Sequence, residues 1–241
     1  MNELALFAGG GGSVLAGKLL GWSTRCAVEI DAGARQILLD RMRDGILKPF
    51  PVWDDVTTFD GNPWRGSIDV ITGGFPCNDV SIAGGGAGLD GVKSGLWVEM
   101  ARIICEVRPS FVFVENSPML TARGLGRVLG DLARMGFDAK WGVFHASTVG
   151  AAHHRARLYL VAYTDSAKLE SMDIPKSVEV DPKESRRRQF ARAVDAAIPA
   201  DDYTKMPRNP DDVARGMDGL KATGNGWVPA VAARAWGKLL K

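Results

Sequence analysis

Cysteine and histidine are both scarce in this chain of 241 residues, which contains three of each. An odd and low number of cysteines argues against a disulfide framework and fits a reducing compartment. His153 and His154 are adjacent, so they cannot share one face of a helix, and no cysteine pair has the spacing of zinc ligands. We therefore expect no metal site.

Long apolar runs are missing as well, since none approaches the roughly 20 residues that a membrane-spanning helix needs. The opening residues, MNELALFAGGGG, have no basic segment ahead of an apolar stretch, which argues against a signal peptide. We expect a monomer without a membrane partner. Its expected location is cytoplasmic, in the host cytoplasm if the gene is carried by a phage.

Neither sign of charge dominates, because the formal net charge is only +2, a value that neither requires nor excludes nucleic acid. The charge is uneven, however. Residues 183–192, KESRRRQFAR, hold five basic side chains and one acidic one. A solvated helix face and a set of phosphate contacts both remain open as interpretations of this run.

The composition that is present is ordinary for a soluble globular protein, with 46% apolar and 24% charged residues. The length suits one α/β domain with a small insertion. Segments of strand length alternate with segments of helical periodicity. We expect strands at residues 3–7, 25–30, 68–72, 111–114, 141–145 and 157–162, and helices at 14–20, 32–43, 96–107, 124–135 and 230–240. This alternation predicts an α/β fold with a mostly parallel sheet and helices on both faces.

The alternation stops near Tyr163. Residues 164–222 have few apolar runs, many charges and five prolines. We therefore expect three parts: a main domain over 1–163, a small separate region over 164–222, and a final segment, 223–241, whose helix returns to the main domain.

A glycine-rich segment, Phe7 to Gly12, lies between the first expected strand and helix, where open α/β sheets bind ligands. Glu29 ends the next strand, and a carboxylate there can accept hydrogen bonds from both hydroxyls of a ribose. The dinucleotide spacing G-x-G-x-x-G is absent, because Val14 and Leu15 stand where the third glycine is required. A nucleoside cofactor without a pyrophosphate is therefore favoured. Asp55 either contacts an adenine amino group or caps a turn.

A later strand ends in GGFPCNDVS, residues 73–81, which places Cys77 at the carboxyl edge of the sheet. Pro76 fixes φ and stiffens the approach to the cysteine. A thiolate is a strong nucleophile, so Cys77 is a candidate for covalent catalysis. The alternative, a small buried hydrophobic residue, is the better interpretation for Cys26 and Cys105, which lie within apolar periodic segments.

Glu115 follows the apolar run FVFV and should reach the same edge. Desolvation there should raise its pKa, so that it can hold a proton for a substrate nitrogen, although an ion-paired or helix-capping acid remains the alternative. Arg155 and Arg157 alternate in a strand and so share one face. They suit a carbonyl oxygen or a phosphate, or else a surface salt-bridge pair.

Taken together, these segments resemble the DNA (cytosine-5) methyltransferase family. The similar residues occur in the family's order: Leu6-Phe7-Ala8-Gly9 with Gly11-Gly12, Val28-Glu29-Ile30-Asp31, Asp54-Asp55-Val56, Gly74-Phe75-Pro76-Cys77 with Ser81, Glu115-Asn116, Arg155 with Arg157, and Gly224-Asn225. The resemblance covers residues 1–163 and 223–241. Phe-Pro-Cys joined to a distant Glu-Asn after an apolar strand is highly specific, whereas the glycine loop is not.

The resemblance implies a Rossmann-like sheet that binds S-adenosylmethionine, with S-adenosylhomocysteine as product. It implies methylation of C5 of a flipped cytosine in a short duplex DNA site, through a bond between Cys77 and C6. The implied catalytic group is Cys77, Glu115, Asn116, Arg155 and Arg157, with Glu115 donating a proton to N3 and Arg157 holding O2. The implied cofactor contacts are Phe7, Ala8, Gly9, Gly11, Gly12, Glu29, Ile30, Asp55, Val56, Pro76, Asn225 and Gly226.

DNA contacts are expected from Ser81 and from Arg186, Arg187 and Arg188, with 164–222 as the target-recognition region. The six glycines of residues 81–95 suggest a lid over the flipped base. Two residues depart from the family pattern: Ser117 replaces a usual valine, and Trp227 stands where small aliphatic residues are usual. RNA cytosine C5 methylation on the same fold is one alternative. A DNA-binding relative without turnover is another, and the intact Cys77, Glu115 and Arg157 argue against it.

Overall fold

The computed structural model describes residues 1–76, 96–149, 155–164 and 226–240. Several predictions therefore concern residues outside the described ranges. These are the roles of Cys77, Ser81, Asn225, Arg186, Arg187 and Arg188, the lid at residues 81–95, and the structure of all but the first residue of 164–222.

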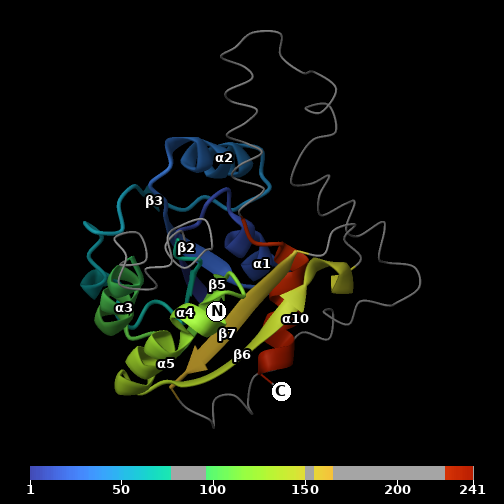
Figure 1. The fold of residues 1–241 in the computed structure, drawn as a ribbon. Helices are drawn as coiled ribbons and strands as arrows, with labels where there is room; N and C mark the ends of the chain where they lie inside the picture. Colours follow the sequence, from blue (N-terminus) through green and yellow to red (C-terminus); the bar gives the residue numbers. More distant parts are fainter. Residues whose placement is uncertain (77–95, 150–154, 165–225, 241) are drawn as a thin grey trace.

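One seven-stranded sheet forms the centre of the molecule, in the order β3-β2-β1-β4-β5-β7-β6 (Figure 1). The strands are β1 Asn2–Leu6, β2 Ser23–Val28, β3 Val52–Trp53, β4 Val70–Gly73, β5 Phe111–Asn116, β6 Asp138–His145 and β7 Ala156–Tyr163. The first five run parallel to one another. This confirms the mostly parallel sheet, and the short β3 is an element that the sequence did not predict.

The strand β7 differs from the expected parallel pattern, because it runs antiparallel to both β5 and β6. Only residues 146–155 join β6 to β7, and they include the short 3-10 turn Ala146–Val149. A parallel crossover needs a dozen or more residues, usually with a helix, so this connection is too short to return the chain in the same direction. As a result β7 begins at the edge of the sheet where β5 ends.

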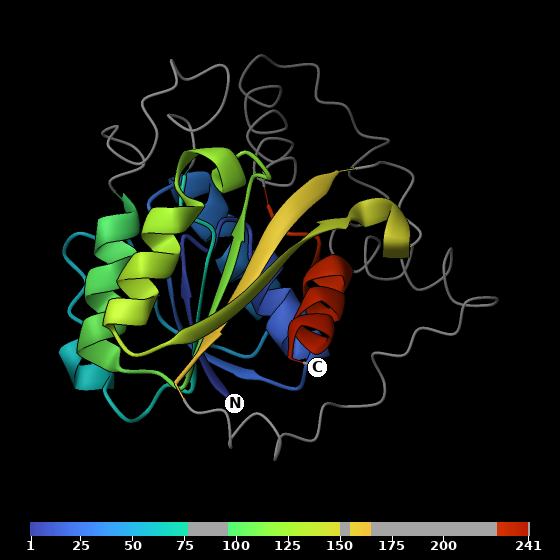
Figure 2. The same cartoon turned by 60° about the horizontal axis from the view of Figure 1, so that its bottom comes forward.

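Helices cover both faces of the sheet (Figure 2). On one face lie α3 Leu96–Val107, α4 Leu120–Arg123 and α5 Leu125–Arg134, and on the other lie α1 Gly12–Leu19, α2 Ala32–Arg43 and α10 Pro229–Leu239. The expected helices at 32–43 and 96–107 are found with those bounds. The segment expected as one helix at 124–135 is preceded by the separate short helix α4.

Burial explains why β5 is central. All six of its residues are buried, including the apolar run FVFV that packs against helices on both faces. The helix α10 packs against this part of the sheet through Trp236, whose ring centroid lies 5.2 Å from that of Phe113. Trp236 also contacts Trp22, with ring centroids 4.7 Å apart, and this contact joins α10 to the turn after α1.

The cysteine expectations hold for one of the two residues that the structure describes. Cys26 is buried in the core, as expected. Cys105 is only partly buried, which differs from expectation because it lies on the flank of α3 rather than on the face toward the sheet. Among the described residues, no helix is both long and apolar enough to cross a bilayer.

Candidate active site at the carboxyl edge of the sheet

The carboxyl ends of four neighbouring strands reach the same level of the sheet. The register pairs Leu6 with both Val28 and Gly73, and pairs Gly73 with Val114. The next residues along these strands therefore lie side by side at this level: Phe7, Glu29 and Gly74, which follow their strands, and Glu115, which is still within β5. The structure thus brings together four positions that are spread over more than 100 residues of sequence, at the edge where open α/β sheets bind ligands.

The glycine loop after β1 is held by the carboxylate of Glu29. The backbone N–H of Gly9 donates to Glu29 Oε2 at 2.6 Å, and the N–H of Asp31 donates to Oε1 at 2.8 Å. The loop turns through positive φ at Phe7 (52°), Gly9 (53°) and Gly11 (90°), and such angles favour glycine at the last two positions. A carboxylate offers about four lone-pair sites, so both oxygens of Glu29 keep capacity for a further donor.

Arg41 stabilises the glycine loop, and the sequence analysis did not identify it. Its guanidinium, which is buried beneath the loop, donates to the carbonyl oxygen of Gly10, and its pKa is lowered by burial. Arg41 comes from α2, which the sequence shows only as a helix with ordinary basic residues. No local pattern marks it, since only the packing of α2 against the loop gives it this role.

The residue after Glu29 has an apolar side chain that is exposed to solvent. Ile30 is 72% exposed, which is unusual for isoleucine and suits a surface that a planar ring covers. Asp55 lies on the neighbouring loop, where its Oδ1 accepts from the N–H and the hydroxyl of Thr57 at 2.9 and 2.8 Å, and these bonds lower its pKa. Both suggested roles of Asp55 thus stay compatible with its place, since it caps a turn and has a second oxygen.

Val56 differs from its neighbours in this group. Its side chain is buried in the core, and its carbonyl oxygen accepts from Arg102 Nη2 at 2.9 Å. The structure therefore places the Val56 side chain with the core packing rather than with the open part of the edge. Ala8 is likewise buried, and its N–H donates to the carbonyl oxygen of Val28 at 3.1 Å.

Glu115 is the buried acid of the site. It is 6% exposed, and its pKa is raised to about 7 by desolvation, against the opposing charges of Arg157 and Arg155. Arg157 Nε lies 2.8 Å from Glu115 Oε1, an ion-pair distance, although no hydrogen bond to Oε1 is formed within the described residues. The expected rise in pKa is thus confirmed, and its cause is burial, as the sequence suggested.

Both arginines of the pair expected in one strand lie beside Glu115, although Arg155 precedes the first residue of β7. Arg155 Nη2 donates to the carbonyl oxygen of Gly226 at 2.7 Å, and burial and the charge of Arg157 lower its pKa. Arg157 Nη1 donates to the carbonyl oxygen of Ala156 at 2.8 Å. The surface salt-bridge alternative is therefore wrong, because the acid that Arg157 contacts is buried.

The side chain of Asn116, at the end of β5, is hydrogen-bonded to the loop that precedes Cys77. Its Nδ2 donates to the carbonyl oxygen of Phe75 at 3.2 Å, and its Oδ1 accepts the N–H of Ser117 at 2.7 Å. Phe75 is anchored in the core, with its ring 5.4 Å from that of Trp97. Pro76 follows as the last described residue before the cysteine. The amide of Asn116 thus fixes the backbone two residues before Cys77.

Trp227 closes the site from the side of α10. A methyl group placed on Gly12 would meet its backbone oxygen at 2.7 Å, and one placed on Gly74 would meet its Nε1 at 2.9 Å and Glu115 Oε2 at 3.2 Å. Trp227 therefore fills the space between the two loops. The sequence identified it only as a departure from a family pattern, and its contacts come from the packing of α10.

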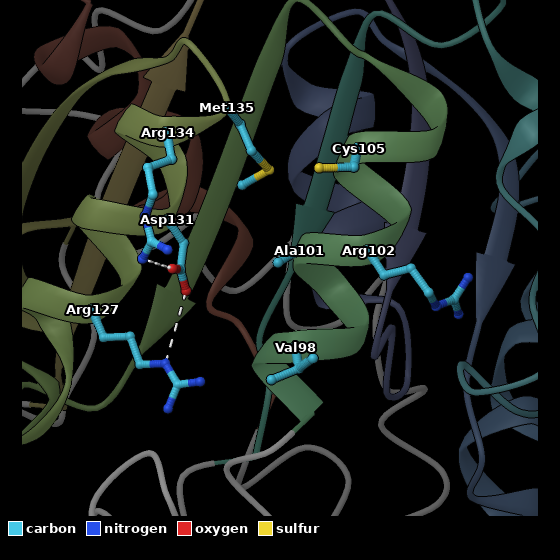
Figure 3. A pocket seen from close by; sticks show the side chains of 8 residues that line it. All are labelled: Val98, Ala101, Arg102, Cys105, Arg127, Asp131, Arg134 and Met135. Carbon is cyan, nitrogen blue, oxygen red and sulfur yellow. Dashed lines mark hydrogen bonds and ion pairs between the residues drawn. The ribbon is translucent and has the colours of Figure 1, made fainter.

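A pocket of about 400 Å³ lies between α3 and α5 (Figure 3). Its charged groups largely satisfy one another. Asp131 accepts from Trp97 Nε1 at 2.8 Å and from Arg134 at 2.5 Å, and it lies 3.9 Å from Arg127. The described ranges contain no cluster of three histidine, cysteine or acidic side chains arranged to hold a metal ion.

Comparison with known proteins finds a protein family whose sequence model matches this chain. The model of the C-5 cytosine-specific DNA methylase family matches residues 1–207. Type II methyltransferase M.CviJI of Paramecium bursaria Chlorella virus IL3A is 38% identical over 163 residues, which are 67% of this chain and 42% of that protein. Type II methyltransferase M.Eco47II of Escherichia coli is 32% identical over 168 residues, 66% of this chain and 38% of that protein. The chain thus spans about two fifths of the length of these relatives.

Solved structures show a similar fold. A prophage-encoded E. coli protein described as a DNA modification methyltransferase has a TM-score of 0.58 and 25% identity, covering 76% of this chain and 52% of that one. The Dnmt2 methyltransferase of S. pombe has a TM-score of 0.52 and 17% identity, covering 68% of this chain and 49% of that one. The second likeness concerns the fold alone.

Proposed function

The chain belongs to the family of C-5 cytosine-specific DNA methylases, and we propose on this premise that it transfers a methyl group from S-adenosylmethionine to C5 of a cytosine in duplex DNA. The observation that supports the proposal most is the state of Glu115. A carboxyl with a pKa of about 7 is partly protonated at neutral pH, and Glu115 lies two strands from the glycine loop at the same edge of the sheet. Such a group can act as a general acid.

The described residues fit a nucleoside cofactor. Glu29 retains acceptor capacity on both oxygens for ribose hydroxyls, and the exposed side chain of Ile30 lies next to it in sequence. Asp55 can accept from an adenine amino group with its second oxygen. The glycine loop lets a ligand approach the backbone closely, and we also assign cofactor contacts to Gly226 and Pro76. S-adenosylmethionine, when bound there, supplies a methyl group activated by a sulfonium.

The chemistry proposed for the chain's own residues begins with Cys77. Cytosine C5 is a poor nucleophile, so the Cys77 thiolate forms a bond to C6 while Glu115 donates its proton to N3. C5 then has enamine character and can accept the methyl group. Loss of the C5 proton to solvent, elimination of the thiolate and return of the N3 proton to Glu115 restore the C5–C6 double bond and the enzyme. Arg157 holds the O2 oxygen of the base, and Asn116 fixes the backbone of the cysteine loop.

The substrate must present a base outside the helical stack, since these groups cannot reach C6 and N3 inside a duplex. We assign phosphate contacts to Arg186, Arg187 and Arg188, and a contact near the flipped base to Ser81. A recognition region of the size of 164–222 can offer only a few side chains to base edges. We therefore expect a short target that contains cytosine.

A mechanism-based trap tests the proposal. Fluorine at C5 cannot leave as a cation, so duplex DNA with 5-fluorocytosine and S-adenosylmethionine should give a covalent adduct visible in the intact mass of the protein. The adduct should be absent in Cys77→Ala, and its persistence in that variant would remove Cys77 from the reaction. Bisulfite sequencing of DNA from cells that express the protein then gives the target, and tRNA tested in parallel separates DNA from RNA methylation.

A further inference from the structure

Tyr159 lies directly opposite Glu115 across the antiparallel pair of β5 and β7. Directly opposite residues share one face of a sheet, with Cβ atoms about 5 Å apart. The ring of Tyr159 is completely buried, between the rings of Phe113 at 5.8 Å, Phe144 at 5.9 Å and Trp227 at 5.8 Å. Phenylalanine would provide the same packing, so the hydroxyl needs a separate explanation.

The hydroxyl of Tyr159 is buried and forms no hydrogen bond with any residue that the structure describes. Oε1 of Glu115 is buried too, and Arg157 Nε lies 2.8 Å from it as an ion-pair partner, which leaves this oxygen capacity to accept a further hydrogen bond. Leaving a buried hydroxyl unmatched costs about 1–3 kcal/mol, and buried polar side chains nearly always have a protein or water partner. The hydroxyl of Tyr159 therefore needs an acceptor, and the carboxyl of Glu115, on the residue directly opposite, can supply one.

Electrostatics connect the same two residues. Burial and the nearby charge of Glu115 both raise the pKa of Tyr159, so its hydroxyl is protonated at neutral pH. It can therefore donate a hydrogen bond there. The other charged groups that face Glu115 are Arg157 and Arg155, both on the β7 side. On the side of α10 stands Trp227, which does not titrate.

We propose that Tyr159 is a positioning residue for Glu115, and that its hydroxyl donates to Oε1 through one ordered water molecule. A bridging water is proposed because the two oxygens form no direct hydrogen bond, and because Tyr159, Glu115 and Arg157 would each offer it a polar group. Arg157 approaches the same oxygen, at 2.8 Å. Oε1 is then held from two sides, while Oε2, near Gly74 and the cysteine loop, remains as the oxygen that carries the proton.

This inference rests on the role proposed for Glu115, but it makes a claim that can be measured without catalysis. A donor to the charged carboxylate stabilises that form, so removing the donor should raise the pKa of Glu115. Tyr159→Phe removes the hydroxyl and keeps the ring. Tyr163→Phe is the matched control, because Tyr163 stands on the same face of β7 but opposite Phe111, at the other edge of the sheet.

The titration of Glu115 can be followed by NMR of protein labelled with 13C at the glutamate carboxyl carbons, without DNA or cofactor. Glu115→Gln identifies the resonance, because it removes that signal. We expect Tyr159→Phe to move the midpoint upward by about 0.5 unit or more, the size typical of one lost hydrogen bond to a carboxylate, and Tyr163→Phe to leave it in place. An unchanged midpoint in Tyr159→Phe, or an equal shift in both variants, would overturn the inference.

A second variant protects the test against a loss of folding in Tyr159→Phe. Incorporation of 3,5-difluorotyrosine at position 159 keeps a hydroxyl that is a stronger donor, so the midpoint should move downward instead. Loss of folding would also lower the midpoint, because an exposed Glu115 returns toward its ordinary pKa, so urea unfolding must first show that the labelled protein is folded. An unchanged or raised midpoint in the folded difluorotyrosine protein would contradict the proposal. Absence of methylation with both titration shifts present would count against the proposed function and leave the positioning role of Tyr159 standing.

Discussion

Arg157 Nε lies 2.8 Å from Glu115 Oε1, and yet the pKa of Glu115 is about 7 rather than below the ordinary value of 4.5. Burial therefore outweighs the ion pair and the second charge of Arg155. A rise of that size corresponds to about 3 kcal/mol in favour of the protonated carboxyl. The arrangement keeps an acid available at neutral pH beside two cations that can bind an oxygen of the substrate.

The first prediction concerns the pH dependence of the reaction. The role proposed for Glu115 requires its protonated form, so kcat/KM for DNA should fall as pH rises through about 7. Glu115→Gln should lose about 10²–10⁴-fold in turnover and lose that basic limb, while it keeps cofactor binding. Single-turnover rates between pH 6 and 9 measure both effects. Near-normal turnover of Glu115→Gln would exclude the role.

A second prediction concerns Asn116. Its amide fixes the Phe75 carbonyl oxygen, and an error of about 1 Å in a catalytic loop can cost about 10²-fold in rate. Asn116→Ala should therefore lower turnover at least about tenfold with little change in S-adenosylmethionine affinity. Asn62→Ala, which removes an exposed amide bonded to Asp60, serves as control. A loss confined to cofactor binding would show that Asn116 acts elsewhere.

A third prediction concerns Glu29. Hydrogen bonds to a charged acceptor contribute about 1.5–3 kcal/mol, so Glu29→Ala should raise the dissociation constant of S-adenosylmethionine at least about tenfold in calorimetry. The variant Glu99→Gln on α3 changes an acid that pairs with Arg102 and should bind normally. Because Glu29 also holds the N–H of Gly9, Glu29→Gln is informative as well, and we expect it to bind with intermediate affinity. Unchanged binding in both variants would remove Glu29 from the cofactor site.

A fourth prediction uses two glycines. Gly74→Ala puts a methyl group 2.9 Å from Trp227 Nε1 and 3.2 Å from Glu115 Oε2, so it should destabilise by about 1–3 kcal/mol and reduce turnover. Gly126→Ala in α5 meets no atom within 4 Å and should stabilise by about 0.5–1 kcal/mol, with normal turnover. Chemical denaturation measures the free energy of unfolding of both variants, and a methyl-transfer assay measures their turnover. Equal effects of the two substitutions would mean that Trp227 does not constrain the loop.

A fifth prediction concerns Glu3, a second buried acid, at the far end of β1. The hydroxyls of Thr24 and Thr72 donate to its two oxygens at 2.6 and 2.7 Å, but burial still raises its pKa to about 7. The folded state thus keeps its proton between about pH 4.5 and 7, where the unfolded state has lost it. The free energy of unfolding must therefore fall as pH rises through this window.

The variant Glu3→Gln removes that dependence and should gain up to about 3 kcal/mol of stability at pH 8 relative to pH 5, compared with the parent. Glu115 titrates in the same window, so urea unfolding is best compared in a Glu115→Gln background. A parent protein whose stability does not change between pH 5 and 8 in that background would contradict the assignment.

The sequence by itself determined the fold class and the edge of the sheet at which the candidate residues lie. The runs ELALF and FVFV are long and apolar enough to be buried strands; Ala8 and then glycines follow the first, and Glu115 directly follows the second. Since carboxyl ends of parallel strands share one edge, Glu29 and Glu115 could be placed together from local patterns alone. The rise in the pKa of Glu115 followed from the same argument, because an acid at the end of a buried strand loses its water.

Only the tertiary structure decided the rest, because it depends on contacts between segments with no common local pattern. The direction of β7 came from the short connection after β6, and it placed Tyr159 opposite Glu115. Arg41 beneath the glycine loop and Trp227 between Gly12 and Gly74 owe their places to the packing of α2 and α10. A periodic pattern records which face of a helix is buried, but it does not record which loop that face meets.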